Sequence, residues 1–246
     1  MPRRPSPSSL RLQHKVALVT GATRGIGLAI AHALAAEGCN LVITGRDQSS
    51  LRRISRELAS TKIQILAHPC DVRDPQSIDD LFRPIRQQFK RLDILVNNAG
   101  IAHAILTVDK LPLPLWQDVI ETNLTGMFLM TQAALAIMKR GGTIVNNLSI
   151  VAKGIFAGSA AYIASKHGAL GFTNTLRDEL RSKGIRVIAL LPGATDTDIW
   201  DTFWPQAPRK KMMSPATVAT AVVNAILLPP NATVETIEIL PTVGLL

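Results

Sequence analysis

Short apolar runs alternate with stretches of helical pattern along nearly the whole chain of 246 residues. Strands that are buried on both faces read as continuous apolar runs, and their alternation with helices is typical of a parallel sheet covered on both sides. We therefore expect a single α/β domain built on a doubly wound parallel sheet of seven strands. The expected strands are 16–20, 41–44, 63–67, 94–96, 143–148, 186–191 and 234–239. The expected helices are 25–37, 48–60, 75–89, 113–139, 159–183 and 215–228.

A glycine-rich turn separates the first expected strand from the first expected helix. Residues 18–27 read Leu-Val-Thr-Gly-Ala-Thr-Arg-Gly-Ile-Gly. A strand, a glycine turn and a helix together form the usual binding site for the pyrophosphate of a dinucleotide. Gly21 would allow the tight turn, while Gly25 and Gly27 would let the backbone approach the pyrophosphate. The three glycines also fit a plain loop with a close helix crossing, so the motif needs support from elsewhere in the chain.

A tyrosine and a lysine stand four residues apart in the expected helix 159–183. Tyr162 and Lys166 would share one face of that helix. A lysine ammonium beside a phenol is expected to lower the tyrosine pKa from about 10 and so make the phenol useful in proton transfer. Ser149 precedes the tyrosine by thirteen residues, and its hydroxyl is a candidate to hold a substrate oxygen. Taken alone, such a pair is also found as two polar residues on a solvated helix face.

Together, these residues resemble the short-chain dehydrogenase/reductase family in its single-domain form, from about residue 15 to residue 240. The resemblance implies a Rossmann-type fold and an oxidoreductase that transfers a hydride between nicotinamide and a carbonyl or secondary alcohol. Members that reduce 3-oxoacyl groups on an acyl carrier protein are the most similar in pattern. The ordered motifs are Thr20-Gly21-x-x-x-Gly25-x-Gly27, Asp71-Val72, Asn97-Asn98-Ala99-Gly100, Asn123, Ser149, Tyr162-x-x-x-Lys166 and Pro192-Gly193 with Thr197.

The resemblance also assigns roles to single residues. Tyr162 would protonate the developing alkoxide, and Lys166 would lower the tyrosine pKa and bind the nicotinamide ribose. Ser149 would steady the carbonyl oxygen, although relatives often carry two adjacent serines where this chain reads Asn147-Leu148-Ser149. Asn123 would hold a water in a proton relay behind Lys166; a buried amide that closes helix backbone bonds is the alternative. Further cofactor-binding residues would be Thr23, Arg24, Ile26, Arg46, Asp71, Val72, Asn98, Ala99, Gly100, Pro192, Gly193, Thr195 and Thr197.

The end of the second strand bears on the choice of cofactor. Proteins that bind NAD usually place an acidic residue there to accept the ribose hydroxyls, but this chain places Arg46 at the tip and Asp47 one step later. A guanidinium binds a 2′-phosphate, and Arg24 in the glycine turn adds a second cation. We expect NADP(H), with NAD(H) kept open by Asp47. Ordinary solvation of both arginines in loops is the remaining alternative.

Three segments are expected on the substrate side of the site. They are residues 101–106, 151–156 and 194–213, and the last contains Trp200, Phe203 and Trp204. A mobile apolar lid of this kind suits an apolar ketone or an acyl chain, whereas a packed helix would touch no substrate. Arg140 and Lys183 align with cations that carrier-protein reductases of the family use to dock their acidic carrier, so a carrier-linked substrate is a further possibility.

Composition limits the remaining function classes. Residues 1–14 read as a disordered basic tail before a domain spanning 15–246. The net charge of +9 comes without a nucleic-acid motif, and no uninterrupted apolar run reaches the length of a membrane span. The two cysteines have no metal-binding spacing, which favours a cytoplasmic protein with reduced thiols. A homodimer or homotetramer is expected through helices 113–139 and 159–183. An NAD-dependent alcohol or sterol dehydrogenase and a non-catalytic nucleotide sensor are the alternatives in function.

Overall fold

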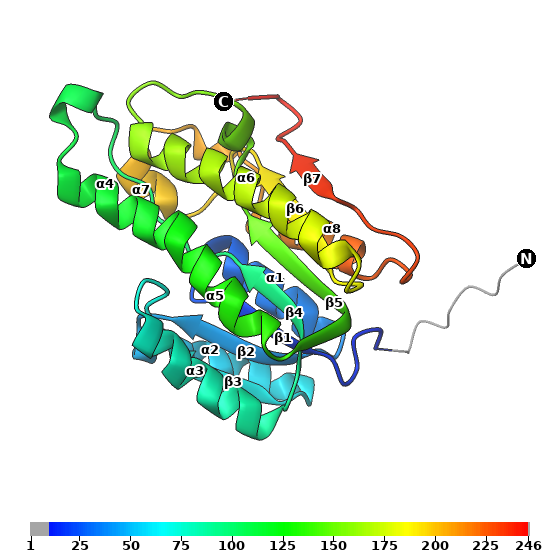
Figure 1. Ribbon diagram of the computed structural model, residues 1–246. Coiled ribbons are helices and arrows are strands. Elements are labelled where there is room, and N and C mark those ends of the chain that lie inside the picture. The colour runs from blue at the N-terminus through cyan, green and yellow to red at the C-terminus, as the bar shows by residue number, and fades with distance from the viewer. Residues whose placement is uncertain (1–9, 246) are drawn as a thin grey trace, which may run out of the picture.

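The computed structural model describes residues 10–245, whose seven strands form one parallel sheet in the order β3-β2-β1-β4-β5-β6-β7 (Figure 1). The strand order reverses between β1 and β4, so the crevice at the carboxyl ends of these strands is the expected place for a ligand. The predicted doubly wound sheet is therefore confirmed. The strands are β1 Val16–Thr20, β2 Asn40–Gly45, β3 Ile65–Pro69, β4 Leu92–Asn97, β5 Met138–Asn147, β6 Arg186–Pro192 and β7 Thr236–Ile239.

Helices cover both faces of the sheet, each with its own apolar core. On one face α1, α2 and α8 pack on the strands, and on the other face α3, α5 and α6 do so. No helix within residues 10–245 combines the length and apolar character that crossing a membrane requires. The helices are α1 Gly25–Ala36, α2 Gln48–Leu58, α3 Pro75–Gln88, α4 Leu113–Ile120, α5 Gly126–Leu135, α6 Ala160–Arg181, α7 Ile199–Phe203 and α8 Pro215–Ile226.

Three helices begin at side-chain caps. Asp47 accepts from backbone amides at the start of α2, Asp74 does so for α3, and Ser214 does so for α8. These caps satisfy amides that have no partner within the helix. By contrast, α1 begins at Arg24 with no side-chain hydrogen bond to its first amides. This uncapped helix end lies at the glycine turn.

The single helix expected over 113–139 is divided. A π-helical turn, Glu121–Thr125, joins α4 to α5, and the three pieces continue along one line (Figure 1). The helix ends at Leu135, and residues expected to be helical already belong to β5, which pairs with Leu92 from Met138 onward. Gly141, with φ +85°, lies between this early part of β5 and the strand expected from 143. The expected helix is therefore shorter at its C-terminal end, because the residues from Met138 pair with β4 instead. The local sequence pattern does not predict this pairing.

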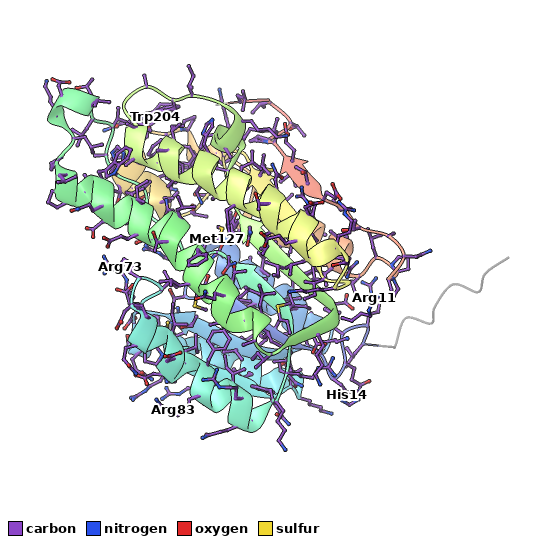
Figure 2. All side chains as sticks on the ribbon, viewed as in Figure 1. Arg11, His14, Arg73, Arg83, Met127 and Trp204 are labelled. Carbon is purple, nitrogen blue, oxygen red and sulfur yellow. The ribbon has the colours of Figure 1, made fainter. Side chains whose placement is uncertain are left out.

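The chain before β1 packs on the domain. Leu12 is buried in the core beneath α1, and the Arg11 guanidinium pairs with Glu37 at 2.7 Å. Residues 10–14 thus differ from the disordered tail predicted for 1–14, while residues 1–9 of that prediction lie outside the described residues. Figure 2 places Arg11 and His14 at the end of the molecule opposite to Arg73, which follows β3.

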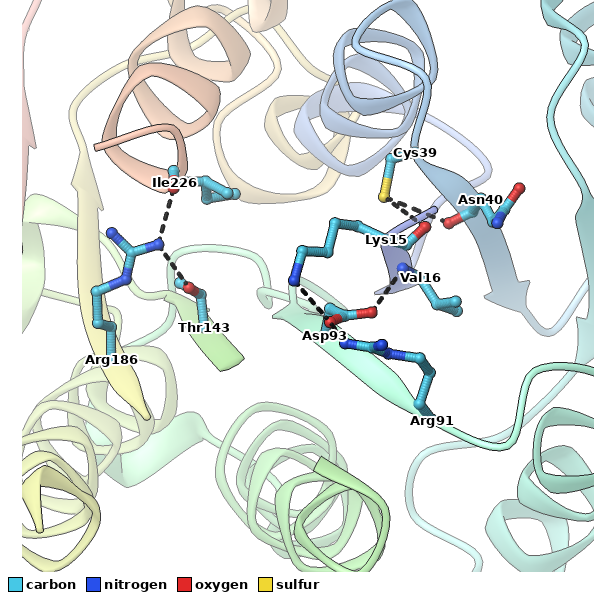
Figure 3. A network of polar contacts seen from close by, with 9 residues as sticks. All are labelled: Lys15, Val16, Cys39, Asn40, Arg91, Asp93, Thr143, Arg186 and Ile226. Atoms are coloured by element: carbon cyan, nitrogen blue, oxygen red, sulfur yellow. Dashed lines mark hydrogen bonds and ion pairs between the residues drawn. The ribbon is translucent and has the colours of Figure 1, made fainter. Parts of the chain in front are cut away.

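A polar network ties the strands together at their amino ends (Figure 3). The Asp93 carboxylate is only 5% exposed and accepts from Lys15 Nζ at 3.1 Å, from the Val16 amide at 3.0 Å and from Arg91. The three donors supply the hydrogen bonds that a carboxylate loses when it is buried away from water. This network stabilises the edge of the sheet that faces away from the crevice.

Candidate active site

A cavity of about 780 Å³ lies at the carboxyl ends of the strands. Ligand pockets in proteins have volumes of roughly 300–1,000 Å³, so a dinucleotide with a small substrate is a reasonable occupant. Of the residues predicted for the site, Gly27 and Asn123 do not line the cavity. The predicted residues that line it are Gly21, Thr23, Arg24, Gly25, Ile26, Arg46, Asp71, Val72, Asn98, Ala99, Gly100, Ser149, Tyr162, Lys166, Pro192, Gly193, Thr195 and Thr197.

Helix α6 places Tyr162 and Lys166 on the face that looks into this cavity. Lys166 Nζ lies 5.5 Å from the centroid of the Tyr162 ring and donates a hydrogen bond to the Asn147 carbonyl at 3.0 Å. Ser149, directly after β5, hydrogen-bonds with the Tyr162 side chain. The three side chains predicted for the chemistry are therefore neighbours around one part of the cavity.

Burial controls the protonation of this pair. It raises the pKa of Tyr162 to about 12, while the hydrogen bond with Ser149 acts in the opposite direction. It also lowers the pKa of Lys166, which is 5% exposed, to about 8. The lowered tyrosine pKa expected from the sequence is wrong for the protein's own residues, because the cost of burying a phenolate exceeds the effect of the nearby amine. At neutral pH the phenol keeps its proton and the amine is mostly charged.

Asn123 is fully buried in the π-helical turn between α4 and α5. Its Oδ1 accepts from the Ile101 amide at 2.8 Å, and its Nδ2 donates to the Ile101 carbonyl at 2.9 Å and to Ser165 Oγ at 3.0 Å. The side chain thus fastens the loop after β4 to α6 beneath the cavity. Its role in a proton relay stays a prediction, and π-helical turns of this kind are frequent at functional sites.

The glycine turn is shaped by two different demands. Gly21 and Gly25 have φ values of +60° and +55°, a backbone conformation that side chains disfavour. Gly27 has another function, because a Cβ at this position would lie 2.5 Å from the Gly21 carbonyl oxygen and closer still to Nδ2 of Asn98. Gly27 therefore allows α1 to pack against the turn after β4. Its predicted role in letting the backbone approach a pyrophosphate stays a prediction.

Charged residues gather at the end of the cavity formed by the loops after β2 and β3. Arg46 lines the cavity, whereas Asp47 is occupied as the cap of α2, where hydrogen bonds from Ser50 and Ser49 lower the pKa of its carboxyl to about 2. Arg24 lines the cavity as well and pairs with Asp198 at 3.4 Å. Asp47, the reason for retaining NAD(H) as a possible cofactor, is thus bound to α2. Arg24 and Arg46 line the cavity.

Comparison with known proteins agrees with this geometry. The family model for short chain dehydrogenases matches residues 15–208. The chain belongs to this family. FabG of Aquifex aeolicus, a 3-oxoacyl-[acyl-carrier-protein] reductase, is 38% identical to this short-chain dehydrogenase over 229 residues, which are 87% of this chain and 90% of FabG.

Two solved structures are also similar to this short-chain dehydrogenase. An alcohol dehydrogenase from Thermococcus sibiricus, complexed with 5-hydroxy-NADP, has a TM-score of 0.86 and 30% identity, covering 93% of this chain and 97% of its own. A 3-ketoacyl-(acyl-carrier-protein) reductase from Brucella melitensis, complexed with NADH, has a TM-score of 0.84 and 27% identity, covering 94% of this chain and 98% of its own. The predicted family, Rossmann-type fold and oxidoreductase class are confirmed.

The segment after β6, predicted as a mobile lid, is a folded element of this short-chain dehydrogenase. Arg209 pairs with Asp196 at 3.3 Å and with Asp201 at 2.9 Å, and it donates to the Thr197 carbonyl. Helix α7 lies within this segment, as in the packed-helix alternative to a lid, but unlike that alternative it lines the cavity. One arginine therefore holds together the loop that presents Thr197 to the cavity.

Aromatic rings form the cavity wall next to Tyr162. The Phe203 ring centroid lies 5.8 Å from that of Tyr162, 5.3 Å from Phe156 and 5.7 Å from Trp200. The indole of Trp200 donates to the Thr195 carbonyl at 2.8 Å, which orients the ring. Trp204, labelled in Figure 2, extends this group, with its ring centroid 6.3 Å from that of Trp200. The part of the cavity beyond Tyr162 is consequently walled by packed aromatic rings.

Several cavity residues were missed by sequence reasoning, and two of them make hydrogen bonds that shape the site. Arg73 binds the Asp71 carboxylate through Nε and Nη2 and also pairs with Asp118 of α4 at 2.9 Å. The Asp71 carboxylate is therefore already hydrogen-bonded within the chain, and its role in cofactor binding stays a prediction. The position of Arg73, two residues after Asp71, was the signal available in the sequence. Asn147 is the second of these two residues, and no sequence motif marks it.

The cations considered for a carrier protein are far from this cavity within one chain. Arg140 lies near the start of β5, and Lys183 follows the end of α6. Both positions belong to the edge of the sheet opposite the carboxyl ends of the strands. Arg140 donates to the Ser182 carbonyl there. Their predicted role in docking an acidic carrier protein stays a prediction.

Proposed function

We propose that this short-chain dehydrogenase is an NADP(H)-dependent oxidoreductase that reduces the carbonyl of an apolar ketone or a 3-oxoacyl thioester and catalyses the reverse oxidation. The observation that carries the proposal is the Tyr162–Lys166 pair beside Ser149, in a cavity that begins at an uncapped helix N-terminus. The family alone does not name the substrate, because one fold serves many reactions.

The residues of the glycine turn fit a dinucleotide. The first amides of α1 have no side-chain cap, so they are available to a pyrophosphate at the positive end of the helix dipole. A Cβ on Gly25 would lie 3.1 Å from Cγ2 of Thr197, so only a glycine leaves this passage open. Thr197, with Thr195 as the competing candidate, would bind the nicotinamide carboxamide from the loop after β6.

The bound nicotinamide would supply or accept the hydride. Tyr162, protonated at neutral pH, would give its proton to the oxygen as the hydride reaches the carbonyl carbon. Ser149 would donate a hydrogen bond to the same oxygen, whose negative charge grows in the transition state. Lys166 would hold a ribose hydroxyl and stabilise the tyrosinate that remains, and Asn123 would hold the water from which Tyr162 regains its proton.

The preference for NADP(H) is argued from two observations. Arg46 and Arg24 line the cavity, and the Asp47 side chain is used as the N-cap of α2. The NADP analogue bound by the Thermococcus sibiricus relative supports NADP(H), whereas the NADH bound by the Brucella melitensis relative keeps NAD(H) as the second candidate. We expect Arg46→Ala to weaken NADPH binding without affecting NADH. Arg52, exposed on α2 and absent from the cavity lining, provides the charge-matched control.

The direct test combines Tyr162→Phe with titrations of both cofactors. Turnover should be lost while the NADPH dissociation constant changes by less than about threefold, because the phenyl ring keeps its packing against Phe203. Unchanged turnover would remove Tyr162 from the mechanism. NADH binding at least tenfold tighter than NADPH, about 1.4 kcal/mol, would favour an NAD-dependent alcohol or sterol dehydrogenase instead.

The aromatic wall supports an apolar substrate, and the similarity to FabG supports a 3-oxoacyl group that is linked to a carrier. A panel of aldehydes, ketones and 3-oxoacyl thioesters, free and carrier-linked, would separate these classes. No turnover of any carbonyl in the panel, despite cofactor binding, would favour a nucleotide sensor.

A homo-oligomer through α5 and α6 is proposed as well. Phe128 of α5 is 44% exposed and packs edge-on against Phe172 of α6, at 6.1 Å between centroids. Light scattering of Phe128→Glu against the native chain would test this contact.

A further inference from the structure

Asn147, at the end of β5, carries a side-chain oxygen without a partner in the described part of the chain. The residue lines the cavity and is only 9% exposed, and its Oδ1 receives no hydrogen bond. A buried acceptor left without a donor costs free energy, so such atoms call for an explanation. Of the buried side-chain atoms without a partner in residues 10–245, this is the one that belongs to a cavity-lining residue.

The orientation of the Asn147 amide is fixed by its neighbours. Its Nδ2 donates to Oδ1 of Asn98 at 2.8 Å. The Asn98 amide cannot be reversed, because its own Nδ2 donates to the carbonyls of Thr20 and Gly21 at 2.9 and 3.1 Å. Asn147 must therefore direct Nδ2 at Asn98, and its oxygen remains as the free group.

The position of Asn147 identifies which part of a ligand it would meet. Its backbone carbonyl accepts from Lys166 Nζ, the group that would hold the nicotinamide ribose. Arg46 instead follows the last residue of β2, which is the third strand from β5 in the sheet, after β4 and β1. Asn147 is thus at the end of the cavity near Tyr162 and Lys166, and distant from the proposed 2′-phosphate site.

We infer that Asn147 Oδ1 accepts a hydrogen bond from the nicotinamide half of the bound dinucleotide, and so positions that half beside Lys166. This inference rests on the proposed function. The donor has to be an O–H of the ribose or the N–H of the carboxamide, since these are the donors that this half of the cofactor presents. The inference adds Asn147 to the cofactor-binding residues, and no motif in the sequence predicts this role.

Two ligands that share the adenine half provide the test. NADP⁺ contains the nicotinamide half, whereas 2′,5′-ADP keeps the 2′-phosphate and one phosphate at the glycine turn and lacks the rest. Calorimetric titration measures the dissociation constant of each ligand with the folded protein and needs no turnover. We expect Asn147→Leu to weaken NADP⁺ binding by roughly 3- to 10-fold, the range for one neutral hydrogen bond. Binding of 2′,5′-ADP should change by less than about twofold.

Arg46→Ala is the matched control, because it should weaken both ligands by a similar factor. Asn147→Ala repeats the measurement with a smaller side chain and serves if the leucine variant does not fold. Binding of 2′,5′-ADP reports whether the binding site for the adenine half of the cofactor is intact in each variant. The NADP⁺ analogue in which an acetyl group replaces the carboxamide distinguishes the two donors. If the Asn147 substitution weakens binding of this analogue as much as binding of NADP⁺, the donor is the ribose hydroxyl. If it does not weaken binding of the analogue, the donor is the carboxamide N–H.

Equal weakening of NADP⁺ and 2′,5′-ADP would overturn the inference, because it would mean that Asn147 acts through Asn98 on the glycine turn. Unchanged binding of both ligands would overturn it too, since the free oxygen would then have no ligand. Failure of the proposed cofactor is seen separately, as a native chain that binds neither NADP⁺ nor 2′,5′-ADP.

Discussion

The amine of Lys166 should cost this protein stability, and removing it should stabilise the fold while abolishing turnover. Lys166 is 5% exposed, and burial lowers its pKa from 10.5 to about 8. The folded state therefore disfavours the charged amine relative to the unfolded chain. Lys166→Met keeps the length and apolar stem of the side chain and removes the charge.

The expected magnitude follows from this shift. At about 1.4 kcal/mol for each pKa unit, the change from 10.5 to about 8 corresponds to a penalty of about 3 kcal/mol in the native protein at pH 7. Loss of the hydrogen bond from Lys166 to the Asn147 carbonyl offsets about 1 kcal/mol of this. We expect the free energy of unfolding at pH 7 to rise by about 2 kcal/mol in the variant.

The pH dependence separates this cause from a change in packing. Between pH 8 and pH 10.5 the unfolded state binds more protons at Lys166 than the native state, so the stability of the native protein rises with pH. It is lowest below pH 8, where the amine is charged in both states. The methionine variant lacks this rise, so its advantage should shrink toward pH 10.5. Tyr162, whose raised pKa reduces stability above pH 10, is present in both proteins.

Urea unfolding at one fixed protein concentration measures these differences. Lys183→Met is the control, because this lysine is exposed and should change stability by less than about 0.5 kcal/mol at any pH. A Lys166→Met protein that is less stable than the native chain at pH 7, or whose advantage stays constant up to pH 10.5, would refute the reasoning.

Two further predictions concern the glycine turn and the segment after β6. Gly27→Ala should lower the free energy of unfolding by about 2–4 kcal/mol, because its Cβ meets Asn98 and backbone; Gly171→Ala, whose Cβ meets nothing within 4 Å in α6, should be neutral or stabilise by up to about 1 kcal/mol. Similar losses in both would contradict the packing role. Arg209→Met should release residues 196–201, raising amide hydrogen exchange there by roughly tenfold and increasing the KM for the cofactor more than it reduces kcat. Unaltered exchange in this segment would show that other contacts hold it.

The alternation of apolar runs and helical patterns was sufficient to predict the sheet and the edge that carries the site. Every strand in a sheet of this kind runs in one direction, so motifs that follow different strands must meet at one edge. Gly21, Asn98, Ser149 and Pro192 are far apart in the chain and line one cavity for this reason. Local backbone preferences encode such a pattern, and no knowledge of contacts is needed to interpret it.

Contacts between distant segments account for what the sequence did not predict. The function of Gly27 depends on Asn98, the order in residues 194–213 depends on Arg209, and the end of the helix at Leu135 depends on the pairing of Met138 with β4. Gly27 and Asn98, like Met138 and Leu92, lie far apart in sequence, so no short window of residues contains both members of either pair. Arg209 lies in the same loop as its partners, but the path of that loop follows neither a helical nor a strand period.

The protonation of Tyr162 separates most clearly what the sequence pattern predicts from what the folded structure determines. The four-residue spacing correctly brought Tyr162 and Lys166 together, yet it gave the wrong direction for the tyrosine pKa. Spacing along a helix specifies which charges are neighbours, whereas the cost of a charge depends on how much protein surrounds it. That surrounding material comes from β5, α6 and the segment after β6, and it exists only once the chain has folded.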